Sequence, residues 1–175
     1  MEFTGADLGQ NGGSPQGVVL DGAGNLFGAA HRYFEDLDYN EVFVFKITPA
    51  GAFSIVGSTG IPFDHFPAGR VALDASGNIF GSIRPDDDDP AFLYRMAPDG
   101  TVTEISKPRD TGLPYGLVRG PGGAFYGYAT TASYNVSSSR IAKITANGSY
   151  SEFGLLDPTT HGSYPTGNAG MDALP

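Results

Sequence analysis

An all-β fold built from repeated antiparallel units of four strands is predicted by three observations. The 175-residue chain contains 26 Gly and 13 Pro, which indicates many short elements joined by turns. The pentapeptide GNLFG at 24–28 returns as GNIFG at 77–81 and, more loosely, as GAFYG at 123–127. Pro-x-Gly anchors at 15, 67, 114 and 165 divide the chain into units whose length and strand number are typical of β-propeller blades.

Turn chemistry places the strands of each unit. One tight turn rich in Gly, Asp or Ser joins the first two strands, and another joins the last two. The expected strands are 17–21, 25–30, 41–48 and 52–57, then 70–74, 78–83, 91–97 and 101–106, and finally 116–120, 124–129, 140–145 and 149–154. The run VFVFKI does not alternate, which indicates a strand covered on both faces. No segment shows a sustained 3.6-residue apolar period, so almost no helix is expected.

The repeated pentapeptide combines a turn with the start of a strand. Gly24 and Asn25 suit a turn that tolerates a positive φ. Leu26 and Phe27 are expected to point to opposite faces of the second strand. Gly28 is expected to keep the backbone clear where neighbouring blades converge.

The chain is interpreted as a single domain, residues 1–175. Its blades are expected at about 15–60, 67–107 and 114–156, with a partial blade at 165–175 that completes or overlaps 1–14. Two interpretations stay open: a fragment of a six- to seven-bladed ring, or a half-propeller of which two copies close a ring. The start of the chain, FTGADLGQNGGSPQG, matches FGLLDPTTHGSYPTG near its end and favours the fragment, because two copies would contribute that segment twice. Exposed blade faces would promote homo-oligomers.

The units resemble the GloVer repeats of bacterial propellers, which read roughly GNLYGTT followed by GTVFKLTPDG. The residues that carry the resemblance are 24–28, 44–49 and Gly51 in the first unit, and 77–81 with 94–100 in the second. The opening P-x-G and D-x-x-G-N is also similar to NHL and streptogramin-lyase propellers. The third unit departs from the pattern at Ala124 and at 146–147. The resemblance implies an extracellular or periplasmic protein, although the start MEFTGADLGQ carries no secretory signal.

Composition excludes several classes of partner. With 19 acidic and 10 basic residues the net charge is −9, so neither nucleic acid nor an anionic membrane surface is expected as a partner. The apolar runs are too short to span a membrane. The absence of cysteine excludes disulfides, thiolate metal sites and cysteine nucleophiles.

The longer connections are expected to carry function. Because consecutive strands are antiparallel, the tight turns share one end of the blades, and the connections AHRYFEDLDYN, RPDDDDP and TTASYNVSSS lie at the other with the loops between blades. His31, Arg84 and Thr130 each follow the second-strand glycine by three residues. The candidate ligand-binding residues at this end are His31, Arg84, Thr130, His65, His161 and Tyr134.

Metal and catalytic signals are weak. Asp86 and Asp88 are candidate calcium ligands, but the aspartate run lacks EF-hand spacing, and a solvated loop is the favoured interpretation. No nucleophile–base pair is recognised, so no catalytic residue and no cofactor are predicted.

The function favoured by these patterns is a non-catalytic binding or scaffold module that uses the longer loops to hold a protein or carbohydrate ligand. One alternative follows from the resemblance: an enzyme of the streptogramin-lyase or lactonase kind with a divalent metal, Ca²⁺ or Mg²⁺, near His31. Another alternative is a half-propeller that serves structural self-assembly.

Overall fold

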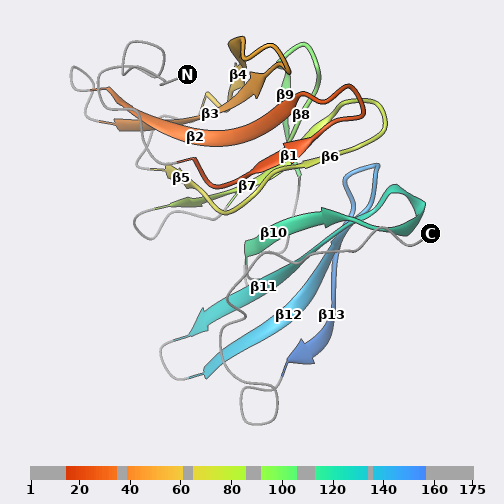
Figure 1. Cartoon of the computed structure of the whole chain (residues 1–175). Coiled ribbons are helices and arrows are strands. Elements are labelled where there is room, and N and C mark those ends of the chain that lie inside the picture. The colour runs from red at the N-terminus through yellow and green to blue at the C-terminus, as the bar shows by residue number, and fades with distance from the viewer. Residues whose placement is uncertain are drawn as a thin grey trace.

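The computed structural model describes residues 15–34, 39–60, 65–85, 92–105, 113–133 and 136–156, which form strands and one short 3-10 turn (Figure 1). The strands are β1 (Val18–Leu20), β2 (Leu26–Phe34), β3 (Tyr39–Ile47), β4 (Phe53–Ser58), β5 (His65–Pro67), β6 (Ala72–Leu73), β7 (Ile79–Pro85), β8 (Phe92–Met96), β9 (Val102–Glu104), β10 (Leu113–Arg119), β11 (Phe125–Ser133), β12 (Val136–Ile144) and β13 (Tyr150–Leu156). The 3-10 turn η1 is Pro121–Gly123. Each strand expected from the sequence overlaps one of these, and the expected near-absence of helix holds for the described residues.

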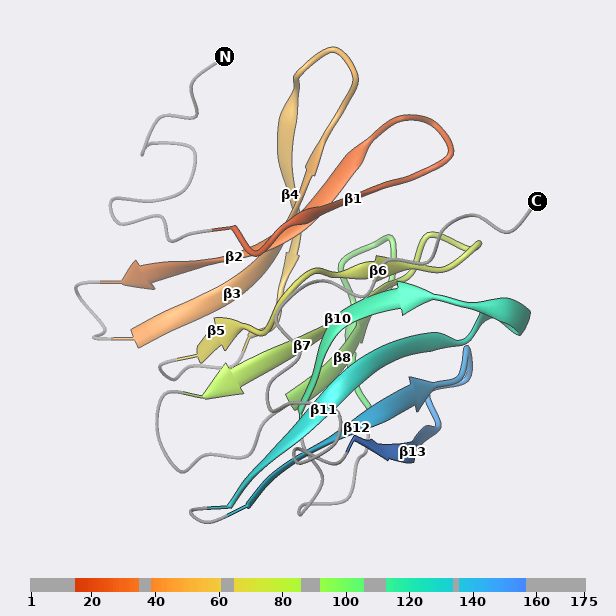
Figure 2. The same cartoon turned by 60° about the horizontal axis from the view of Figure 1, so that its bottom comes forward.

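Three antiparallel sheets follow one another along the chain. The first is β1-β2-β3-β4 and the third is β10-β11-β12-β13. In the second sheet β5 and β6 both pair with β7, so together they take the place of the first strand, and β8 and β9 follow. Figures 1 and 2 show the second sheet lying between the other two. This arrangement is consistent with a β-propeller-like fold, and each sheet has the strand order of a blade.

Two hydrophobic cores hold the sheets together. The core between the first and second sheets contains Ala29, Val42, Val44, Val71, Ile79, Ile83, Tyr94 and Met96. The core between the second and third contains Ala72, Phe80, Leu93, Ile105, Leu117, Phe125 and Ile144. Consecutive residues such as Ile79 and Phe80 enter opposite cores, because side chains alternate across a strand. In the run VFVFKI, Val42 and Val44 enter the core with the second sheet, whereas Phe43 and Phe45 form a separate buried cluster with Ala30 on the other face. The prediction of a strand covered on both faces is therefore confirmed.

The tight turns are held by an aspartate at the end of the first strand. Asp21 Oδ1 accepts hydrogen bonds from the backbone N–H groups of Ala23 at 2.9 Å and Asn25 at 2.8 Å, and its Oδ2 accepts one from Asn25 Nδ2 at 2.7 Å. Asp74 makes the same three bonds with Ser76 and Asn78. Asx turns of this kind shape the chain without help from neighbouring sheets. The third unit has Gly120 in place of the aspartate and forms η1 instead.

The glycine that closes the pentapeptide has a different role from the one expected. A Cβ at Gly28 would lie 2.8 Å from Phe45 Cε1, and a Cβ at Gly81 would lie 2.5 Å from Tyr94 Cζ. Phe45 and Tyr94 are the cross-strand partners of these glycines within the same sheet. The glycine therefore makes room for an aromatic ring of its own blade and not for the approach of a neighbouring blade.

The loops expected at 30–40 and 130–139 are largely strand. β2 continues to Phe34 and β3 begins at Tyr39, and the β11–β12 hairpin is paired up to Ser133 and Val136. Cross-strand partners such as Arg32 and Glu41 stabilise this extension, because Arg32 Nε and Nη2 donate to Glu41 Oε2 at 2.9 and 2.6 Å. In the described part of the chain, no helix has the length and apolar character needed to cross a membrane.

Candidate functional site

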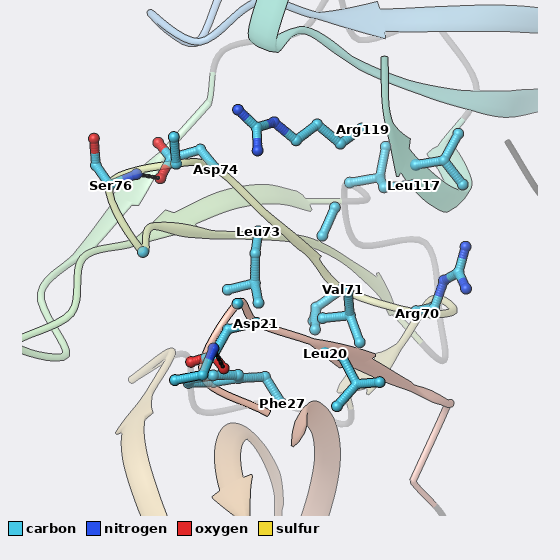
Figure 3. Close-up of a pocket in the computed structure, with 17 residues that line it drawn as sticks. Leu20, Asp21, Phe27, Arg70, Val71, Leu73, Asp74, Ser76, Leu117 and Arg119 are labelled. Carbon is cyan, nitrogen blue, oxygen red and sulfur yellow. Dashed lines mark hydrogen bonds between the residues drawn. The ribbon is translucent and has the colours of Figure 1, made fainter. Parts of the chain in front are cut away.

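A cleft of about 690 Å³ lies where the first strands of the three sheets approach one another (Figure 3). It is lined by 19–23 and Phe27 of the first sheet, 70–77 of the second and 117–119 of the third. We call it the axial cleft. Its walls are β1, β6 and β10 together with the tight turns that follow β1 and β6. Three segments far apart in the sequence therefore form one site.

The middle of the axial cleft is apolar. Figure 3 shows the side chains of Leu20, Leu73 and Val71 between the polar groups at its edges. Val71 is buried, whereas the side chain of Leu20 is 63% exposed. Leu20 thus offers apolar surface that a ligand can cover, and such burial is the main source of favourable binding free energy.

The carboxylates of the cleft are held in place by hydrogen bonds within their own turns. The Asp21 carboxylate accepts three hydrogen bonds, and the Asn25 side-chain amide is the largest cause that lowers its pKa below the usual 3.8. Asp74 is held by the same three bonds. A general base for neutral pH needs a pKa near that pH, so the lowered pKa of Asp21 is unsuited to proton transfer. Ionised Asp21 contributes a fixed negative charge.

Arg119 supplies an accessible positive charge. Its side chain is exposed, and within the described ranges it forms no ion pair. Figure 3 shows its guanidinium group extending toward the side of the cleft where Asp74 and Ser76 lie. The first two units carry Leu20 and Leu73 at the position of Arg119. This departure from the repeat is the signal in the sequence that pointed to the cleft. It was missed because function was expected on the longer connections at the other end of the sheets.

His31 lies at the opposite end of the first sheet, on a strand and not on a loop. It is part of β2, in register with Val42, and its ring meets the edge of Phe66 with centroids 4.8 Å apart. Its Nδ1 is buried without a hydrogen-bond partner among the described residues. Burial lowers the pKa of His31 below 6.5, so the imidazole is neutral at pH 7.

Of the other candidate residues, two share the end of the molecule where His31 lies. Arg84 is on β7 in register with Phe66, the residue that touches His31, and His65 on β5 is in register with Pro85. Thr130 belongs to the third sheet, where it pairs with Leu113 and Ser139. None of these four residues is on a loop. The candidates that lie outside the described residues are Tyr134, His161, Asp86 and Asp88.

The described residues contain no group of three or more His, Asp or Glu side chains placed to hold a metal ion. The metal site that the family resemblance implied near His31 is not tested by these residues and stays a prediction.

Comparisons with known proteins leave the family of this chain open. Neither a scan of protein families nor a search of curated proteins returns a match. Among solved structures, one described as a streptogramin B lyase structure is similar over 89% of this chain and 73% of that chain, with 14% sequence identity and a TM-score of 0.42. A likeness at this level carries no argument, so the fold rests on the sheets themselves and membership of the GloVer-type repeat stays a prediction.

Proposed function

We propose that the chain is a non-catalytic binding module of an exported or surface protein, and that its ligand occupies the axial cleft. The observation that carries this proposal is the cleft itself, which collects residues from all three sheets. Its volume of about 690 Å³ lies within the range typical of ligand sites, about 300–1,000 Å³. Because its walls are paired strands and hydrogen-bonded turns, the site is organised before the ligand arrives, which reduces the entropy lost on binding.

The side chains of the cleft are better suited to binding a ligand than to catalysing a reaction on it. Asp21 and Asp74 hold their turns through three hydrogen bonds each, and moving either carboxylate to take a proton would break those bonds. The guanidinium of Arg119 carries only hydrogen-bond donors and no acceptor, so it offers no base. The groups that remain are an apolar strip and charges of both signs, which is a surface for recognition.

A segment of another protein is the ligand that fits this surface. Leu20 offers exposed apolar area, and Arg119 can pair with a carboxylate through its planar fork. Among the described residues that line the cleft, Phe27 is the one aromatic side chain, so these residues offer few of the stacking platforms that favour sugars. We therefore expect a peptide segment that places an apolar side chain near Leu20 and an Asp or Glu near Arg119.

Selection of peptides from a random displayed library tests this proposal. The selected peptides should contain an acidic residue next to an apolar one, and Arg119→Leu should weaken their binding about tenfold or more, since a charged hydrogen bond contributes about 1.5–3 kcal/mol. Arg119→Leu should preserve the fold, because Leu20 and Leu73 stand at the equivalent positions. Arg119→Lys keeps the charge but loses the planar two-donor geometry, so its affinity for the peptides should lie between the affinities of wild type and Arg119→Leu.

Ala50→Asp is the matched control, because it places a charge on an exposed turn outside the cleft. Peptides whose affinity is the same for wild type and Arg119→Leu would remove the axial cleft as the site. Loss of affinity in His31→Gln with Arg119→Leu unaffected would move the site to the opposite end of the sheets. Binding only to a glycan panel would replace the peptide by a carbohydrate.

An enzyme with a divalent metal near His31 is a second candidate, favoured by one observation. His31 is neutral at pH 7, and its Nδ1 has no partner among the described residues, so an acceptor nitrogen is available for a ligand or a proton. Equilibrium dialysis against Mg²⁺ and Ca²⁺ decides this question. Stoichiometric binding that disappears in His31→Ala would establish the metal site, whereas no binding at millimolar metal would eliminate it.

A further inference from the structure

The axial cleft is lined by a second arginine besides Arg119. Arg70 lies in the segment between β5 and β6 of the second sheet, whereas Arg119 lies in β10 of the third. Figure 3 shows the two side chains on different sides of the apolar middle of the cleft. The apolar surface that a ligand can cover is therefore flanked by two guanidinium groups from different sheets.

Arg70 is an extra residue relative to the repeat. Between the glycine of the Pro-x-Gly anchor and the residue that opens the tight turn, the first and third units carry three residues, whereas the second unit carries four, 70–73. The chain accommodates the extra residue by bulging out of the ladder with β7 at 69–71. Bulges redirect side chains and are frequent next to active sites. The extra residue adds a positive charge at a point of the cleft where the other two units have none.

The stem of the Arg70 side chain lies against the first sheet. A Cβ built on Gly17, the residue before β1, would lie 3.6 Å from Arg70 Cβ and 3.9 Å from Arg70 Cγ, so the first methylene groups of Arg70 lie beside this glycine. Arg70 is half-buried, and its guanidinium carries five N–H donors, so it can contact the protein and a ligand at the same time. Because the stem is already ordered, a contact through Arg70 loses less side-chain entropy on binding.

The two arginines differ in their acidic surroundings. The carboxylates that the described lining of the cleft provides are Asp21 and Asp74, and both belong to the tight turns. Figure 3 shows the Arg119 guanidinium on the side of Asp74, and Arg70 at the end of the cleft away from both carboxylates. Within the described lining, the end with Arg70 therefore has the more positive potential. A carboxylate of a ligand meets less repulsion there than beside Arg119.

We propose that the ligand of the axial cleft is a peptide segment with two acidic residues, one on each side of an apolar residue, and that Arg70 binds the second carboxylate. This inference rests on the proposed function, because it keeps the same peptide in the same cleft and adds Arg70 as a specificity-determining residue. The guanidinium of Arg70 pairs with the carboxylate through two parallel N–H···O bonds. Two charged contacts with an apolar contact between them fix the register of the peptide along the cleft.

A random displayed peptide library, selected in parallel on wild type, Arg70→Gln and Arg119→Leu, tests the proposal. Wild type should enrich peptides with an acidic residue on each side of an apolar one. Arg70→Gln keeps the stem and removes the charge, so one acidic position should lose its enrichment while the apolar position and the other acidic position keep theirs. Arg119→Leu should lose the other acidic position, and Arg70→Lys, which keeps the charge, should retain both.

Arg140→Gln is the matched control. It removes the same charge from a side chain of the third sheet that is 48% exposed and lies outside the cleft. The ion pair of Arg140 with Glu152 is exposed on the arginine side, and the loss of such a pair changes stability little. The peptides enriched on Arg140→Gln should match those enriched on wild type.

Enriched peptides in which one acidic residue is replaced by its amide measure the same contact on the unaltered chain, so this step does not depend on the folding of a variant. The acidic residue lost on Arg70→Gln should contribute about tenfold in affinity for wild type, as expected for a charged hydrogen bond. The same amide replacement should change the affinity for Arg70→Gln by less than about twofold, because the partner charge is already absent.

The outcomes separate the role of Arg70 from the proposed function. A single enriched acidic residue that depends on Arg119, with Arg70→Gln indistinguishable from wild type, would overturn the role of Arg70 and leave the proposed function intact. Enrichment that neither Arg70→Gln nor Arg119→Leu changes would overturn both. An equal loss in Arg140→Gln would reduce the effect to net charge and would also overturn the role of Arg70.

Discussion

Substitution of Gly81 by alanine tests how the aromatic ring of each blade is seated. An ideal Cβ at Gly81 would lie 2.5 Å from Cζ and 2.7 Å from Cε1 of Tyr94. Tyr94 is 1% exposed in the core between the first two sheets, so its ring has no open space to enter. Overpacking of this kind costs about 1–3 kcal/mol, and the reduced backbone freedom of alanine in the unfolded chain offsets about 0.5–1 kcal/mol.

Because the Cβ and the ring would approach to 2.5 Å, the upper half of the overpacking range, about 2–3 kcal/mol, applies. The net loss of unfolding free energy is therefore about 1–2.5 kcal/mol, which lowers the midpoint of thermal unfolding by about 2–10 °C for a chain of this size. Circular dichroism melting and urea unfolding measure both quantities. Gly22→Ala is the matched control: a Cβ there meets no atom within 4 Å, so the change should stay within about 0.5 kcal/mol.

A double substitution shows whether the ring is the cause. Tyr94→Leu removes the atoms that an alanine at position 81 would meet, so the cost of Gly81→Ala should shrink in that background by about 1 kcal/mol. If Gly81→Ala were as stable as Gly22→Ala, or if the two costs were additive, the steric explanation of the repeated glycine would be wrong.

Two further predictions concern protonation. The pKa of Asp21 is lowered, chiefly by the Asn25 amide, so its carboxylate stabilises the fold above pH 3.8 and this contribution is lost as the pH falls through the lower folded pKa. Asp21→Ala should therefore flatten the pH dependence of the urea midpoint in this acid range, and an unchanged slope would contradict the role of the turn. Burial lowers the pKa of His31, so stability associated with the neutral imidazole is present above pH 6.5 and is lost as the pH falls through the folded value. An NMR titration of the His31 ring should show a midpoint below 6.5, and a midpoint at or above 6.5 would contradict its burial.

The strands and turns were predictable because their determinants are local. Asp21 and Asn25 form their turn through contacts that span four residues, and Gly24 and Gly77 adopt the positive φ values of 82° and 79° that such turns need. The third unit lacks the aspartate and the asparagine. Its turn was still predictable from the pair Gly122 and Gly123, because glycine tolerates a positive φ, and both residues adopt one in the structure.

The candidate site was predictable only in part, because its determinants are not local. His31 was expected on a loop, since polar residues follow it, yet Arg32 lies in a strand whose partner strand supplies Glu41. That ion pair exists only once the register of β2 and β3 is set. The axial cleft depends on Leu20, Asp74 and Arg119, which meet only when three sheets stack.

The sequence by itself determined the repeat, the order of the strands and the chemistry of the tight turns, because each of these depends on hydrogen bonds and backbone preferences within a few residues. The tertiary structure decided which end of the sheets carries the cleft and which side chains form the cores between the sheets. Those features depend on packing between segments about fifty residues apart, where burial and not local propensity determines the arrangement.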